Sequence, residues 1–165
     1  MWEPPFRDRR DAGRQLAHIL SRYQEHPDLT VLSLTRSAIP VAYEVAIKTG
    51  APLEERLVGP SLAGRTVILV DDGLAAHALP AAIEVVRRLD PDQIVAAVAA
   101  APAETCRELA KLADEAVCVV SAFPADAYWD LAESPEKELD LLVREAAESA
   151  ALSKRESPRR GGRES

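Results

Sequence analysis

Short apolar runs alternate with amphipathic segments along most of the chain. Four runs read as buried strands because they lack the polar alternation of a half-exposed strand; they cover residues 29–34, 66–70, 94–100 and 116–120. Apolar residues at helical spacing mark five further segments, which are 6–23, 41–48, 78–89, 104–113 and 135–150. This alternation predicts an α/β fold, a doubly wound and mostly parallel sheet flanked by helices, with a Rossmann-like core.

Local signals support several helix boundaries. Asp8 is a typical N-cap for the first helix, and Gly50 is a typical C-terminal glycine for the second. Pro80 falls in the first turn of the third helix, where its missing N–H costs little, and Ser134 is a typical cap for the last. The helical pattern of the first segment directs three arginines away from its apolar face: Arg9, Arg10 and Arg14.

Length and composition predict a single domain. A chain of 165 residues is long enough to enclose one core, and 47% hydrophobic with 4% aromatic residues means a core of alanine, valine and leucine. We expect the domain to cover residues 1–150 and a disordered polar tail to cover 151–165. The linker 51–60 has little pattern beyond one short strand at 55–58.

Charge and apolar content exclude some classes of protein. A net charge of -7 argues against a general nucleic-acid binder, which needs a basic face. Neither a bilayer-spanning apolar run nor the apolar segment of a signal peptide is expected. Two cysteines, Cys106 and Cys118, lack the spacing of a zinc site, and we expect both to be small, reduced core thiols in a cytoplasmic protein.

The strongest candidate site follows the strand 66–70. Asp71 and Asp72 come directly after it, Gly73 can turn the chain, and a helix begins soon afterwards. Ligands of open α/β sheets bind beyond the carboxyl ends of the strands, where carboxylates can hold sugar hydroxyls or a hydrated Mg²⁺ and a helix start can hold phosphate. An equally open interpretation is that the two carboxylates cap the next helix or solubilise the sheet edge.

A second junction joins the strand 29–34 to the helix 41–48. Its loop comprises Thr35, Arg36, Ser37 and Ala38. Loop N–H groups and the Arg36 guanidinium would suit an anion. The local pattern alone favours an ordinary connection with a solvated arginine.

Four segments together resemble one family, the type I phosphoribosyltransferases, in particular an uncharacterised bacterial branch. Residues 6–17 (FRDRRDAGRQLA) look like its opening F-x-D-R-x-D-A-G-x-x-L-A, and residues 34–42 (LTRSAIPVA) look like its L-x-R-G-G-V-P-V-A. Residues 67–75 (VILVDDGLA) are similar to its signature strand and loop, and 123–131 to its aromatic segment. The likeness extends to about residue 145.

The resemblance implies a binding site for phosphoribosyl pyrophosphate (PRPP) or another sugar phosphate or nucleotide. Asp71 and Asp72 would be the catalytic pair that holds the ribose hydroxyls, with Mg²⁺ bound through water at both if the protein is active. The loop 35–38 would meet pyrophosphate. The phosphate loop would consist of Gly73, Leu74, Ala75, Ala76, His77, Ala78 and Leu79. The resemblance also implies a homo-oligomer.

Three departures from the family pattern bear on activity. Ala76, His77 and Leu79 stand where the phosphate loop normally has threonine, glycine and threonine, so hydroxyl donors are lost and Leu79 would place an apolar side chain where the phosphate belongs. Ser37 and Ala38 replace a glycine pair in the pyrophosphate loop. The segment 51–64, which in relatives covers the acceptor base, is short and keeps only Arg56 of a basic motif.

Three functions remain in view. The favoured one, because three losses coincide, is a family member with a modified sugar-phosphate site that is catalytically weak or inactive and acts as a binding or regulatory protein. The alternative is an active Mg²⁺-dependent enzyme that transfers the phosphoribosyl group from PRPP to a nitrogen acceptor and releases pyrophosphate, with a protonated His77 compensating at the phosphate. A receiver-like signalling domain is least favoured, because no aspartate ends the strand 94–100.

Overall fold

The computed structural model describes residues 6–24, 26–55, 62–73, 76–121 and 135–156. Within them the strands form one parallel five-stranded sheet in the order β2-β1-β3-β4-β5. The strands are β1 (Leu29–Ser33), β2 (Leu53–Glu54), β3 (Thr66–Asp71), β4 (Gln93–Ala100) and β5 (Glu115–Val120). The predicted parallel α/β sheet is confirmed.

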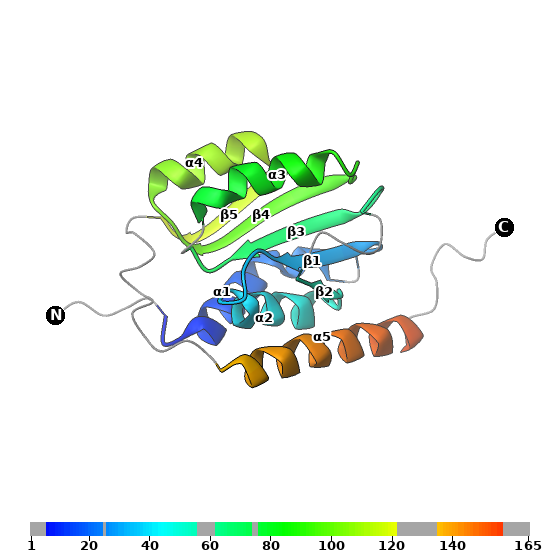
Figure 1. Cartoon of the computed structure of the whole chain (residues 1–165). Helices are drawn as coiled ribbons and strands as arrows, with labels where there is room; N and C mark the ends of the chain where they lie inside the picture. The colour runs from blue at the N-terminus through cyan, green and yellow to red at the C-terminus, as the bar shows by residue number, and fades with distance from the viewer. Residues whose placement is uncertain (1–5, 25, 56–61, 74–75, 122–134, 157–165) are drawn as a thin grey trace.

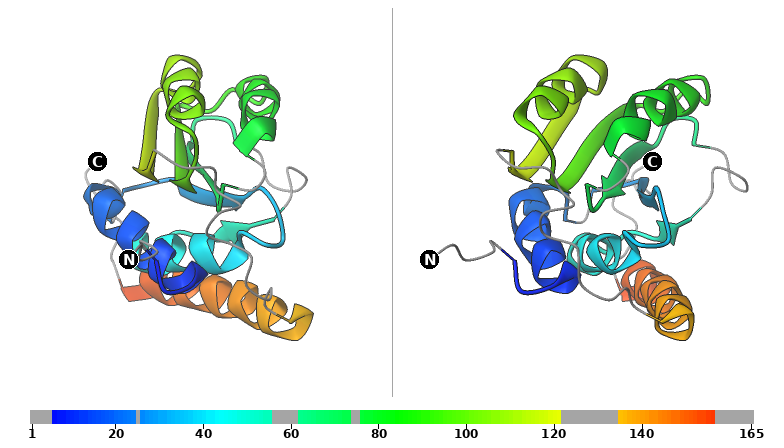
Figure 2. Two further views of the ribbon diagram at one scale, coloured as in Figure 1. Left: turned by 90° about the vertical axis from the view of Figure 1, so that its left-hand side faces the viewer. Right: turned by 60° about the vertical axis from the view of Figure 1, so that its left-hand side comes forward.

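Helices cover both faces of this sheet (Figure 1). One face carries α1 (Arg9–Ile19), α2 (Ile39–Thr49) and α5 (Glu136–Glu156), and the other carries α3 (Leu79–Arg87) and α4 (Ala103–Leu112), as the turned views in Figure 2 make clear. Two 3₁₀ helices, η1 (Leu20–Tyr23) and η2 (Ala76–Ala78), adjoin α1 and α3. None of the described helices is long and apolar enough to cross a membrane.

Alternate residues of the central strands pack into two separate hydrophobic cores, one on each face of the sheet. All residues of β1 and β3 are buried, which explains their continuous apolar pattern. Val31, Ile68 and Val70 pack with α1, α2 and α5. Leu32, Val67 and Leu69 pack with α3 and α4 on the other face.

Several predicted boundaries are confirmed. Asp8 caps α1 by accepting a 2.8 Å hydrogen bond from the Asp11 N–H. Gly50 ends α2 in the left-handed conformation at φ 77°, which glycine adopts without a Cβ penalty. Pro80 lies in the first turn of α3.

Other boundaries differ from the prediction. The short strand expected at 55–58 lies mostly outside the described residues; the structure shows β2 at Leu53–Glu54, paired with Val31 and Leu32. The last helix continues to Glu156, so the first six residues of the predicted tail are helical. Residues 157–165, the capping Ser134 and the aromatic segment 123–131 lie outside the described residues.

The prediction of two reduced thiols is wrong. Cys106 and Cys118 form a disulfide between α4 and β5, with their Cα atoms 6.4 Å apart. The reason is topological. After β4 the chain folds back over the sheet as α4, and the first turns of α4, which carry Cys106, lie over β5, which carries Cys118. Lasting disulfides are typical of oxidising compartments, so the cysteines no longer support a cytoplasmic location.

Gly13 allows α1 and α2 to approach closely. A Cβ built on Gly13 would lie 2.8 Å from the Val41 carbonyl oxygen and 2.9 Å from the Glu44 Cβ, closer than real Cβ atoms come. Both neighbours are backbone or the rigid base of a side chain, so they cannot swing aside.

We expect Gly13→Ala to destabilise the fold by about 1–3 kcal/mol through overpacking, although alanine is favoured over glycine in a helix by about 1 kcal/mol. The measurement is the free energy of unfolding in urea. His18→Ala on the exposed face of α1 is the control and should change stability by less than about 0.5 kcal/mol. A Gly13→Ala protein as stable as the wild type would contradict the close helix contact.

Asp114 links β4, β5 and α3. Its Oδ2 accepts a 2.9 Å bond from Arg87 Nη1 and a 2.8 Å bond from the Ile94 N–H. The Arg87 hydrogen bond, followed by that of the Ile94 N–H, lowers the pKa of the Asp114 carboxyl. The stabilisation is therefore complete above the unfolded-state pKa and is lost as pH falls through the lower folded-state pKa.

Asp114→Asn should reduce the free energy of unfolding at pH 7 by up to about 1 kcal/mol, since the side chain is partly exposed. The difference from the wild type should shrink once the pH is below about 4. Urea unfolding at pH 7 and pH 3 measures both. Asp92→Asn, an exposed carboxylate just before β4, is the control; a difference that is independent of pH would contradict the assignment.

Candidate functional site

The strand order creates a switch point between β1 and β3. From β1 the chain passes through α2 to the edge strand β2, and then returns to β3 on the opposite side of β1. Ser33 and Val70 are in register, so the loops after the two strands start side by side. Ligands of open parallel sheets bind where two such loops diverge. Both sequence-predicted loops therefore lie at this position.

Asp71 and Asp72 are completely buried at the end of β3. Asp71 Oδ2 accepts a 2.8 Å hydrogen bond from the Gly73 N–H. Gly73 has φ 113°, a conformation that strains residues with a Cβ. The chain thus turns sharply at the glycine, as its sequence position predicts.

Asp72 joins three distant parts of the chain. Its Oδ2 accepts a 3.0 Å bond from Arg9 Nε at the start of α1 and another 3.0 Å bond from Ser37 Oγ in the loop after β1. The side chain of Arg9 is 8% exposed. The carboxylate is therefore buried together with a guanidinium and a hydroxyl that satisfy it.

The prediction that Arg9 points away from the core is wrong. The helical pattern counts arginine as polar and assigns it to solvent, but the first turn of α1 lies at the carboxyl ends of the strands, where Asp72 needs a partner. A usable signal was present, since Arg9 belongs to the segment 6–17 that resembles the family opening.

The loop after β1 is tied together by hydroxyl groups. Ser33 Oγ donates to the Thr35 carbonyl oxygen at 2.9 Å, and Thr35 Oγ1 lies 3.1 Å from Ser37 Oγ. Ala38 has φ -87°, and among the described residues other than glycine only Asp28 and Asp90 have positive φ. The loop therefore has a backbone that suits the serine and alanine found in place of two glycines.

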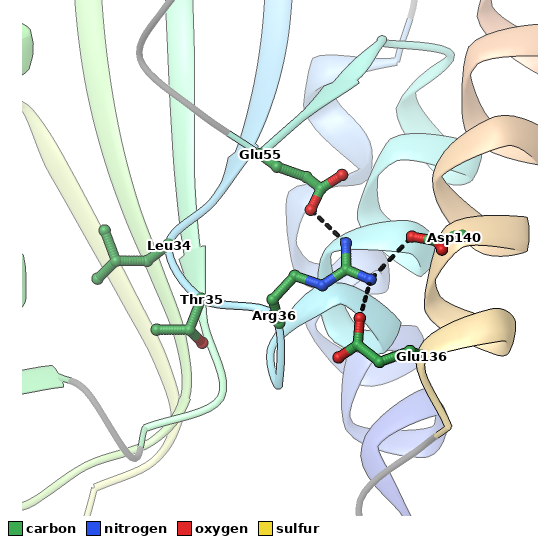
Figure 3. A pocket seen from close by; sticks show the side chains of 6 residues that line it. All are labelled: Leu34, Thr35, Arg36, Glu55, Glu136 and Asp140. Atoms are coloured by element: carbon green, nitrogen blue, oxygen red, sulfur yellow. Dashed lines mark hydrogen bonds and ion pairs between the residues drawn. The ribbon is translucent and has the colours of Figure 1, made fainter.

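Arg36 points away from the strand ends toward α5 (Figure 3). Its guanidinium bonds to Glu55 at 2.5 Å, to Glu136 at 2.6 Å and to Asp140 at 2.8 Å. These three carboxylates, called the acidic cluster below, raise the pKa of Arg36, chiefly through the hydrogen bond that Arg36 donates to Glu55. The guanidinium is thus already saturated with negative partners.

A hollow of about 510 Å³ surrounds this group. It is lined by Leu34, Thr35, Arg36, Glu55, Glu136 and Asp140. Three carboxylates around one guanidinium leave a formal charge of −2, so the hollow repels anions as it stands. Asp71 and Asp72 are not among its lining residues.

The phosphate loop is described at Gly73 and from Ala76 onward; Leu74 and Ala75 lie outside the described residues. Ala76 is buried and its N–H donates to the Gly73 carbonyl oxygen at 3.2 Å. Leu79 is fully buried among the core residues packed against α3 and α4, whereas His77 is exposed and Ala78 partly so. The residues 76–79 place no hydroxyl donor at the start of α3.

The structure brings only part of the predicted site together. Ser37 meets Asp72, while Arg36 is engaged by the acidic cluster. Sequence reasoning missed Arg9 and the whole acidic cluster. Glu136 and Asp140 gave no signal, because they lie about 100 residues from Arg36 and look like an ordinary charged helix start.

Comparison with known proteins gives sequence relatives and a fold relative. Two Mycobacterium tuberculosis proteins named "Putative phosphoribosyl transferase" (Rv0571c in strain H37Rv, MT0597 in strain CDC 1551) are each 28% identical over 220 residues, covering 89% of this chain. The chain spans about half the length of these curated relatives, of which the match covers 49%. No family model matches.

The aligned region of 220 residues is longer than this 165-residue chain, so the relatives contain segments there that the chain lacks. Among solved structures, that of the Thermus thermophilus protein TT1426 is similar with a TM-score of 0.70 and 24% identity. The similarity covers 86% of this chain and 99% of that one, and it shows a shared fold.

Loss of the Arg9 partner should leave Asp72 as an uncompensated buried charge. We expect Arg9→Met to lower the free energy of unfolding by about 3–5 kcal/mol. Adding Asp72→Asn removes the charge and should recover a large part of that loss, which a double-mutant cycle in urea measures. Strictly additive effects of the two changes would contradict a direct ion pair.

Proposed function

We propose that the chain is a type I phosphoribosyltransferase-like protein that binds PRPP or a related sugar phosphate weakly, has little or no transferase activity, and serves as a binding or regulatory protein. The observation that carries this proposal is that Asp72 and Arg36 are both occupied by the chain's own side chains. The resemblance assigns Asp72, together with Asp71, to the sugar, and Arg36 to pyrophosphate.

Burial of the aspartates supports weak sugar binding. Both carboxylates are 0% exposed, so a ribose hydroxyl has to displace an internal partner before it reaches Asp72. The exchange replaces one hydrogen bond by another of the same kind, and little net binding free energy remains.

The loop expected to hold the phosphate, residues 73–79, also supports weak binding. Alanine and leucine at positions 76 and 79 provide no hydroxyl to a phosphate. A hydrogen bond to a charged group contributes about 1.5–3 kcal/mol, so two missing bonds weaken binding by about two orders of magnitude or more.

The arrangement does not by itself fit a magnesium ion held by protein groups. No three His, Cys, Asp or Glu side chains of the described residues are grouped so that they could hold a metal ion, and the two buried aspartates are engaged. A magnesium ion is bound in proteins by one or two carboxylates together with substrate phosphates. We therefore propose that Mg²⁺ enters only with PRPP, near Asp71 and Asp72.

The alternative proposal is an active transferase. Its support is the retained aspartate pair at the switch point, together with the names of the relatives. Such an enzyme would transfer the phosphoribosyl group to a nitrogen acceptor and release pyrophosphate. The relatives contain segments that this chain lacks, so cover for the acceptor would come from a second subunit of a homo-oligomer.

Calorimetric titration with PRPP and Mg²⁺ separates these proposals. We expect binding in the millimolar range that is lost in the Asp71→Asn/Asp72→Asn protein, with no pyrophosphate released on adding nucleobases or ammonia. Micromolar binding with pyrophosphate release would establish the active enzyme instead. Binding that is equal in wild type and double variant would place the ligand elsewhere.

Removing the acidic charges of α5 should free Arg36 for anions. We expect Glu136→Gln/Asp140→Asn to bind inorganic pyrophosphate several-fold more tightly than the wild type, because two carboxylates no longer compete for the guanidinium. The matched control is Glu138→Gln/Glu148→Gln, which removes the same charge from exposed positions of the same helix. Equal gains in both proteins would show a general charge effect and contradict a specific role of Arg36.

A further inference from the structure

Ser37 joins the buried carboxylate of Asp72 to the partly exposed loop after β1. Ser37 is partly exposed, whereas the carboxylate to which it donates is completely buried. The other donor to the same oxygen, Arg9 Nε, comes from the buried side of α1. Of these two donors, Ser37 is therefore the one nearer to solvent and the one that a ligand hydroxyl can replace more easily.

The contact has the chemistry of a bound sugar hydroxyl. Ser37 Oγ donates to Asp72 Oδ2 at 3.0 Å, the distance and the donor type that a ligand hydroxyl would supply. Its own position is fixed by Thr35 Oγ1 at 3.1 Å, and Thr35 is held in turn by Ser33. The loop thus presents a preorganised hydroxyl to the carboxylate.

We propose that Ser37 is an internal competitor for the hydroxyl group of the sugar phosphate and thereby sets the affinity of the site. The inference rests on the proposed function, because it places the sugar at Asp72. A ligand hydroxyl gains nothing at Asp72 while it only replaces Ser37. When the serine hydroxyl is removed, the ligand hydroxyl gains the whole bond.

The backbone conformation of the loop allows Ser37 to be substituted without strain. The loop takes no positive φ between Thr35 and Ala38, so Ser37→Ala keeps the conformation and removes one oxygen atom only. Ser37→Gly also removes the Cβ and widens the approach to the carboxylate. Ser37→Thr keeps the hydroxyl.

The experiment is calorimetric titration of ribose 5-phosphate, with inorganic phosphate as the probe that has no sugar hydroxyl. We expect Ser37→Ala to bind ribose 5-phosphate about tenfold more tightly than the wild type, the equivalent of one typical hydrogen bond. Its affinity for inorganic phosphate should stay unchanged. Ser37→Thr should behave as the wild type, and Asp72→Asn in the Ser37→Ala protein should abolish the gain.

Ser33→Ala is the matched control. It removes a hydroxyl at the end of β1 that bonds to the Thr35 carbonyl oxygen and not to Asp72, so its gain for ribose 5-phosphate should be far smaller than that of Ser37→Ala. Thermal unfolding of every variant shows whether it is folded, and Ser37→Gly provides a second test should Ser37→Ala fold poorly.

The outcomes separate this inference from the proposed function. If the wild type binds ribose 5-phosphate in an Asp72-dependent manner and neither Ser37→Ala nor Ser37→Gly gains affinity, the inference is wrong and the proposed function stands. A gain that is equal for both probes also overturns the inference. If neither the wild type nor the variants bind ribose 5-phosphate, both fail; if only the variants bind, the competitor is confirmed and binding by the wild type is refuted.

Discussion

The buried pair of Arg9 and Asp72 is the constraint on which the switch point depends. Removal of two ions from water costs several kcal/mol each, and only good geometry with further hydrogen bonds offsets that cost. The 3.0 Å bonds from Arg9 and Ser37 meet this condition. The first turn of α1, the loop after β1 and the end of β3 are consequently held in one relative position, because a shift in any of them would leave a charge buried alone.

The ion pairs of Arg36 differ in kind from this buried pair. The side chains of Glu136 and Asp140 are 73% and 64% exposed, so salt and water screen their attraction for the guanidinium, and such pairs contribute little to stability. Their main effect is on what the loop can bind. An anionic ligand has to compete with these carboxylates for Arg36, whereas the partners of Asp72 are buried and far harder to exchange.

The sequence predicts much of the fold and only half of the candidate site. The strand patterns at 66–70 and 94–100 and the caps Asp8 and Gly50 lead to the correct fold class, a parallel sheet flanked by helices, because burial on both faces and helix ends are local properties. Arg9 is missed because a polar side chain in an amphipathic helix is assigned to solvent by default. Its burial is decided by an aspartate 63 residues away.

The disulfide and the acidic cluster escape prediction for the same reason. Cys106 and Cys118 are separated by 12 residues and meet only because α4 crosses β5, and single-sequence patterns carry no information on that crossing. The sequence shows that Ser37 and Ala38 replace the glycine pair of the family's pyrophosphate loop. The structure adds that Ser37 provides a new bond to Asp72, which no motif comparison could supply.

The placement of Glu136 and Asp140 on α5 also affects the order in which the molecule matures. Arg36 leaves the ribosome about 100 residues before these partners, and contacts between such distant positions form late. A nascent chain that already contains the strands β1 to β5 therefore has Glu55 available to Arg36 before Glu136 and Asp140. The partners from α5 join only when this helix docks on α2, so the acidic cluster acquires two of its three carboxylates late in folding.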